Sequence, residues 1–177
     1  MESLAGYTGQ NLTWVSSPTA KRAYELRDGE LVFATLVQPG LWKQDRVATT
    51  ASGQWTLTLS GWTNKTLSIM DMNGVEAGRV KRSSWGRGSI LEWGDGSQYT
   101  WRATNWWGGK WAWLDANERP IVGFTQQGMF RRRCLVTLAP DAALSVDPAL
   151  LAALGWDLIQ IQNAEAAAVS AATTVHA

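Results

Sequence analysis

The chain has 177 residues, the length of a single domain that can bury a sizeable core. Hydrophobic residues make up 45% and charged residues 18%, a balance that excludes a disordered chain. The formal net charge of +1 argues against a nucleic-acid partner. A single cysteine, Cys134, excludes an intrachain disulfide and favours a reducing compartment.

The first residues, MESLAGYTGQNLTWVSS, lack the basic and apolar regions of a signal peptide. The most apolar segment, PALLAALGWDLIQI, would form a helix of about 21 Å, which is shorter than the roughly 30 Å hydrocarbon layer. We therefore expect a cytoplasmic protein without a membrane span, which can associate with a membrane only peripherally.

Alternating apolar runs separated by turn residues fill residues 12–138. In AYELRDGELVFATLV two such runs flank Asp28-Gly29, a typical type I′ hairpin turn. Further turns are predicted at Ser52-Gly53, Asn73-Gly74, Gly94-Asp95-Gly96 and Ala116-Asn117. The pattern predicts about twelve strands, at residues 12–16, 21–27, 30–37, 45–51, 54–60, 66–72, 75–82, 89–93, 98–103, 111–115, 120–125 and 130–138. Because open sheet edges invite aggregation, this many strands favours a closed antiparallel barrel.

The last part of the chain changes to a helical pattern. Asp147 is the predicted N-cap and Pro148 the first helical residue. The predicted helix, 148–162, is apolar on nearly all sides and must be buried, so we expect it inside the barrel. Residues 1–163 then form one domain, and the Ala-rich residues 164–177 are predicted to fray.

The twelve tryptophans can be core residues or a ligand platform. Side chains alternate between the two faces of a strand, so Trp111 and Trp113 share a face, as do Tyr99 and Trp101. Rings that recur in step with this alternation predict a core. The pair Trp106-Trp107 is the exception, because adjacent residues point to opposite faces and one of the two is expected to be exposed.

Four segments carry a family resemblance: YELRDGELVFATL, SGQWTLTLSG, YTWRATNWWGGKWAWLDANERPIVGF and VTLAPDAALSVDPALLAALGWDLI. In strand order, aromatic spacing and terminal apolar helix the chain resembles the tubby C-terminal-like superfamily over residues 20–163. That group includes tubby-like proteins, phospholipid scramblases and LURP-one-related proteins, and this chain resembles its LURP-one-related and scramblase-like bacterial members. The resemblance implies a twelve-stranded closed barrel around a central C-terminal helix.

The resemblance says less about function than about fold. Tubby-like members bind phosphoinositides through basic side chains, and scramblases are membrane proteins that bind calcium. The chain lacks a scramblase-type cysteine cluster, and DMNGVE has too few carboxylates for an EF-hand calcium loop. No site residue of the family can be matched to a position of this sequence. The resemblance thus implies an anionic lipid as a ligand without naming the residues that bind it.

The sequence offers few residues that could act in catalysis or bind a metal. The sole histidine, His176, is penultimate in the predicted frayed tail, so nucleophilic triads lack a base and zinc sites lack ligands. The carboxylates Glu92, Asp95 and Asp115 lie in the Trp-rich region, where glycosidase chemistry is one interpretation and ordinary turn formation the favoured one. Cys134 shares its parity with core positions and is expected to be inert. We expect no enzyme activity, no cofactor and no metal.

The basic segments RVKRSSWGR and FRRRC are the main functional candidates. Arginine suits phosphate groups, so a patch formed by both segments would bind anions; the alternative is a solvated strand face. The candidate residues are Arg79, Lys81, Arg82, Arg87, Arg131 and Arg133. On the predicted strand 130–138 the even-numbered residues face inward, so Arg131 and Arg133 should face solvent. Arg132 should point toward the barrel mouth and need an acidic partner, for which Asp157 is the candidate.

Three functions follow as hypotheses. The leading one is a non-enzymatic binding or scaffold domain whose basic patch recognises anionic lipid headgroups such as phosphoinositides, or a protein partner. The alternative is a module that binds carbohydrate or another planar ligand on Trp106 or Trp107. The third, a carrier with spare apolar volume, is disfavoured because the central helix would fill the barrel. Oligomeric state is not specified by any pattern in the chain.

Overall fold

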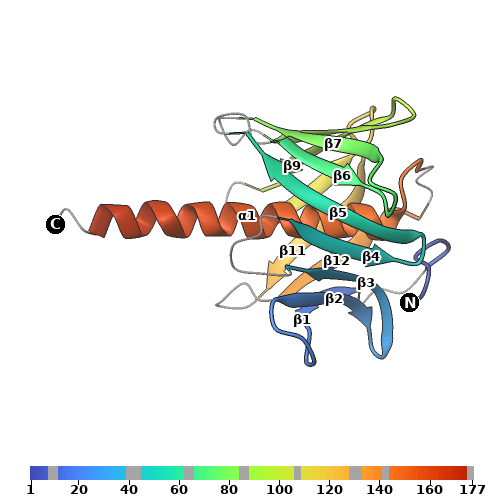
Figure 1. Ribbon diagram of the computed structural model, residues 1–177, viewed down its shortest axis with the longest axis horizontal. Helices are drawn as coiled ribbons and strands as arrows, with labels where there is room; N and C mark the ends of the chain where they lie inside the picture. The colour runs from blue at the N-terminus through green and yellow to red at the C-terminus, as the bar shows by residue number, and fades with distance from the viewer. Residues whose placement is uncertain are drawn as a thin grey trace.

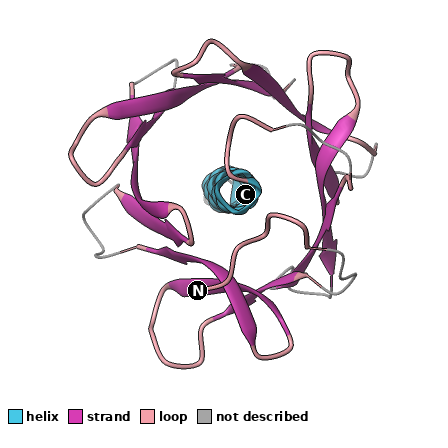
Figure 2. Ribbon diagram, turned by 90° about the vertical axis from the view of Figure 1, so that its right-hand side faces the viewer, coloured by secondary structure: helices cyan, strands magenta, loops and turns pink. Residues whose placement is uncertain are grey.

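The computed structural model describes residues 1–7, 12–38, 45–61, 66–83, 88–105, 109–127, 133–140 and 144–174. In these segments twelve antiparallel strands form a closed barrel, and one helix runs along its axis (Figures 1 and 2). Each strand pairs with its neighbours in sequence, and β1 pairs with β12 to close the ring. The strands are β1 (Thr13–Ser16), β2 (Ala23–Asp28), β3 (Leu31–Val37), β4 (Arg46–Thr50), β5 (Gly53–Ser60), β6 (Thr66–Met70), β7 (Glu76–Arg82), β8 (Ser89–Trp93), β9 (Gln98–Ala103), β10 (Lys110–Leu114), β11 (Pro120–Gln127) and β12 (Arg133–Leu138).

The predicted fold class is confirmed: the barrel is closed, antiparallel and built from strands in the predicted order. Turn chemistry sets the strand ends. Gly29 and Gly74 adopt φ values of 56° and 77°, a left-handed backbone that glycine enters without steric cost. In the β6–β7 turn Oδ1 of Asp71 accepts the N–H groups of Asn73 and Val75, each at 2.8 Å. These hydrogen bonds lower the pKa of Asp71.

The helix α1 (Pro148–Thr174) begins where the sequence predicts it. Oδ1 of Asp147 accepts the N–H of Ala149 at 2.9 Å, and the carbonyl of Asp147 accepts the N–H of Leu151 at 3.0 Å, so Asp147 is the N-cap. Its other carboxylate oxygen accepts the hydroxyl of Ser52 at 2.5 Å. The cap therefore fixes the start of the helix to the β4–β5 turn.

The predicted helix end at Gln162 is wrong, because α1 continues to Thr174 and projects from the barrel (Figure 1). Residues 164–171 are largely exposed, so burial does not hold them in the helix; the run of alanines has high intrinsic helix propensity. Among the described segments, no helix combines the length and apolar character that crossing a bilayer requires.

The core lies between the helix and the inner face of the barrel (Figure 2). Trp14, Trp101, Trp113 and Trp156 are completely buried. Trp14 stacks on Trp156 of the helix with ring centroids 6.1 Å apart, and Nε1 of Trp113 donates to the carbonyl of Leu151 at 2.9 Å. Trp55, Trp93 and Trp111 are partly buried against this core. The core interpretation is confirmed for these seven tryptophans.

Candidate functional site

The two ends of the barrel differ in their connections. Odd-numbered strands lead into even-numbered ones at the end from which α1 emerges, which we call the exit end (Figure 1). Even-numbered strands lead into odd-numbered ones at the opposite end, where short turns surround the start of the helix. A residue's place along its strand therefore decides which end it occupies.

The basic segment on β7 does not form an open cationic patch. Arg79 pairs with Glu76, with Nη2 and Oε1 2.6 Å apart, and Nζ of Lys81 lies 2.8 Å from Oε1 of Glu92. Arg82 makes a bidentate pair with Glu165 at 3.1 and 2.8 Å. Each of the three cations is thus matched by a carboxylate. The fourth candidate of this segment, Arg87, lies outside the described residues.

The second basic segment lies on a different side of the barrel. Four strands separate β12 from β7 in the ring, so the two segments do not form one lateral patch. Arg133 is exposed at the first residue of β12, as the alternation predicts, and Cys134 and Val136 point inward. Arg131 and Arg132 lie outside the described residues. What the two segments share is the exit end, where Arg82 ends β7 and Arg133 begins β12.

Charge is segregated between the two ends of the barrel. In the described strands, connections and helix, the exit end has six basic residues: Lys21, Arg22, Arg46, Arg82, Lys110 and Arg133. Lys81 and Arg102 lie in the exit-end halves of their strands but pair with Glu92 and Glu118 of the opposite end. The acidic residues there are Glu25, Asp45, Asp157 and Glu165. The opposite end has ten acidic residues: Glu2, Asp28, Glu30, Asp71, Glu76, Glu92, Asp95, Asp115, Glu118 and Asp147. Its basic residues are Arg27, Arg119 and Arg79, the last placed by its pairing with Glu76.

A buried ion pair joins the helix to the barrel near the exit end. Asp157 is fully buried, and Nε of Arg46 lies 2.8 Å from its Oδ1. Burial raises the pKa of Asp157 to about 7, although the nearby charges of Arg46 and Arg82 act in the opposite direction. Asp157 therefore pairs with Arg46, while Arg132, the residue for which the sequence suggested Asp157 as a partner, lies outside the described residues.

Several polar atoms of the Asp157–Arg46 pair lack a hydrogen-bond partner among the described residues. Although the two groups are in contact, neither oxygen of Asp157 has an aligned donor among the described residues. Nη1 of Arg46 is likewise buried without a described acceptor. Buried polar atoms without partners are uncommon, so those of this ion pair call for an explanation.

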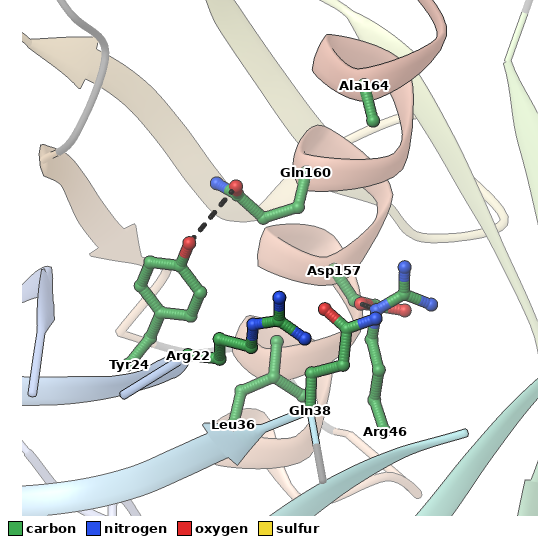
Figure 3. Close-up of a pocket in the computed structure, with 8 residues that line it drawn as sticks. All are labelled: Arg22, Tyr24, Leu36, Gln38, Arg46, Asp157, Gln160 and Ala164. Carbon is green, nitrogen blue, oxygen red and sulfur yellow. Dashed lines mark hydrogen bonds and ion pairs between the residues drawn. The ribbon is translucent and has the colours of Figure 1, made fainter. Parts of the chain in front are cut away.

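A pocket of about 260 Å³ opens beside this ion pair, between α1 and the exit-end residues of β2, β3 and β4 (Figure 3). Asp157, Gln160 and Ala164 lie on one helix face because they are three, four and seven residues apart. Arg22 and Gln38 point toward this face from the barrel wall (Figure 3). The lining residues are Arg22, Tyr24, Leu36, Gln38, Arg46, Asp157, Gln160 and Ala164.

The sequence missed most of this pocket. Asp157 within an apolar helix signals that a partner is needed, but no sequence signal pairs it with Arg46. Arg22 belongs to neither basic segment, and its backbone adopts a φ of 58°, which is uncommon for a residue with a side chain. Its position depends on the register of β2 against β3, where the N–H of Gln38 donates to its carbonyl at 3.1 Å.

The other candidates are accounted for by local structure. Asp95 accepts the N–H of Ser97, and Asp115 accepts the N–H groups of Arg119 and Asn117, so both are turn formers. Hydrogen bonding by the side chain and backbone of Ser97 lowers the pKa of Asp95, and hydrogen bonding by Arg119 and Asn117 lowers that of Asp115. Burial raises the pKa of the Cys134 thiol to about 12, which keeps it unreactive.

No cluster of three metal-ligating side chains occurs within the described ranges. Trp106 and Trp107 lie outside them, so the platform alternative has no geometry to judge.

Comparison of the chain with protein-family profiles, with curated proteins and with solved structures finds no match in any of the three. The charge and shape of the exit end are therefore the features from which a function can be proposed.

Proposed function

We propose that this protein is a non-enzymatic binding domain that recognises anionic lipid headgroups through the exit end of its barrel. The observation that carries the proposal is the segregation of charge along the barrel axis. A molecule with this distribution is oriented by a negatively charged surface, because its basic end is attracted and its acidic end repelled.

Unpaired cations at the exit end support the proposal. Lys21, Lys110 and Arg133 are exposed and form no ion pair with another described residue. Each basic residue near an anionic leaflet contributes about 1 kcal/mol to binding. The resemblance to the tubby C-terminal-like superfamily, whose tubby-like members bind phosphoinositides, supports a phosphorylated headgroup.

The proposal is tested by vesicle flotation. Vesicles of phosphatidylcholine are compared with vesicles that also contain phosphatidylserine or a phosphoinositide, each at low and physiological salt. We expect binding to anionic vesicles alone, weakening as salt screens the charges. Equal binding to neutral vesicles, or no binding to any, would refute the proposal.

A pair of charge-matched variants tests which end binds. Lys110→Gln with Arg133→Gln removes two positive charges from the exit end, and Arg79→Gln with Arg119→Gln removes two from the opposite end. We expect the first variant to lose about 2 kcal/mol, or roughly 30-fold in vesicle affinity, and the second to change little. If both variants lose affinity equally, net charge rather than the exit end controls binding.

A further inference from the structure

We propose that the pocket beside α1 binds a phosphate group, with Arg22 as its principal ligand. This inference deepens the proposed function and rests on it for the lipid source of the phosphate. The same chemistry can come from a phosphorylated lipid headgroup or from a free phosphate ester, and the experiment below separates the two.

The charge of the pocket favours an anion. The charge of Arg46 is matched by Asp157, at 2.8 Å, whereas Arg22 forms no ion pair with any residue in the described part of the chain. Arg22 is therefore the uncompensated charge of the pocket. Its guanidinium group points toward the helix (Figure 3) and presents several N–H donors in a planar arrangement that suits phosphate oxygens.

The polar side chains around Arg22 add donors. Gln38 and Gln160 carry amide groups, and the hydroxyl of Tyr24 lies 3.5 Å from Oε1 of Gln160, at the long limit of a hydrogen bond. Nη1 of Arg46 is buried without a described acceptor. An oxyanion would supply an acceptor for Nη1 of Arg46 and for the amide N–H groups.

The size of the pocket limits the ligand. Its volume of about 260 Å³ lies just below the range of about 300–1,000 Å³ for drug-sized ligands. A phosphate group with part of a sugar or polyol ring is of the right scale. The pocket opens at the exit end, so a headgroup in a membrane facing that end can reach it.

The test measures binding of soluble probes by calorimetry, using inorganic phosphate and inositol 1,4,5-trisphosphate, with unphosphorylated inositol as the negative probe. Arg22→Gln removes the proposed ligand, and Lys21→Gln removes the same charge from the adjacent exposed residue, which does not line the pocket. We expect Arg22→Gln to weaken inositol trisphosphate binding tenfold or more and Lys21→Gln to weaken it less than threefold. Thermal unfolding of both variants establishes that they are folded.

The result that overturns the inference is equal weakening by the two variants, or no binding of either phosphate probe to the unaltered protein.

The exit-end variant Lys110→Gln with Arg133→Gln separates this inference from the proposed function. It should lose vesicle binding yet keep affinity for soluble inositol trisphosphate. If the protein binds the soluble probe but no vesicle, the pocket is a site for free phosphate esters and the lipid function fails. If Arg22→Gln loses phosphoinositide vesicles but not phosphatidylserine vesicles of equal charge, the lipid is the source.

Discussion

Replacing Gly155 with alanine should destabilise the protein, although alanine is the better helix former. Gly155 lies in the buried part of α1, opposite Phe124 of β11 and Trp101 of β9. A Cβ at this position would lie 2.7 Å from Cε2 of Phe124 and 2.9 Å from Cζ3 of Trp101, and closer still to Cζ of Phe124. Real Cβ atoms essentially never approach within 3.0 Å, so a ring or the helix must move.

The expected loss in unfolding free energy is the difference between two opposing effects. Alanine in place of glycine within a helix gains about 1 kcal/mol. Overpacking a core costs about 1–3 kcal/mol, and the upper value applies because Phe124 and Trp101 are buried and pack edge to face with centroids 5.1 Å apart. The net loss in unfolding free energy is therefore about 2 kcal/mol, which lowers Tm by about 4–8 °C for a chain of this size.

Urea unfolding and thermal scans measure this loss, and two controls locate its cause. Gly109→Ala makes the same change where a Cβ would have no neighbour within 4 Å, and should alter stability by less than about 0.5 kcal/mol. In a Phe124→Leu background, Gly155→Ala should cost less, because the smaller side chain leaves room. The reasoning is refuted if Gly155→Ala is neutral or stabilising, or if its cost is the same in both backgrounds.

Two further predictions concern the contact between helix and barrel. Asp157 has its pKa raised by burial, to about 7 from 3.8, so its contribution to stability is full below about pH 4 and is lost as pH rises toward 7. Asp157→Asn should remove that decline, as urea unfolding from pH 4 to 7 can measure; parallel pH profiles for the two proteins would contradict it. Trp113→Phe should cost about 1–3 kcal/mol, because it removes the hydrogen bond to Leu151 and leaves a void. An unchanged urea midpoint would show that this contact is not stabilising.

Local patterns were sufficient for the barrel and the start of its helix. Glycine turns and two-residue alternation place the strands, because a strand exposes its side chains to two faces and a tight turn needs a left-handed residue. Asp147 and Pro148 predict the first turn of α1, because an N-cap satisfies N–H groups within a few residues of itself. The end of the helix was mispredicted at Gln162, because a burial pattern says nothing about an alanine-rich extension outside the barrel.

The candidate functional residues also divide into those that the sequence placed correctly and those that only the structure located. The sequence by itself determined that Arg133 faces outward and Cys134 inward, because the two are adjacent on one strand. It also suggested Asp157 as an ion-pair partner, but for Arg132. Only the tertiary structure decided that the partner is Arg46, that the cations of β7 are neutralised, and that Arg22 lines a pocket with Gln160. The physical reason is that, apart from the local Arg79–Glu76 pair, these contacts depend on strand register and on the position of the helix along the barrel axis, where residues far apart in the sequence such as Arg46 and Asp157 meet.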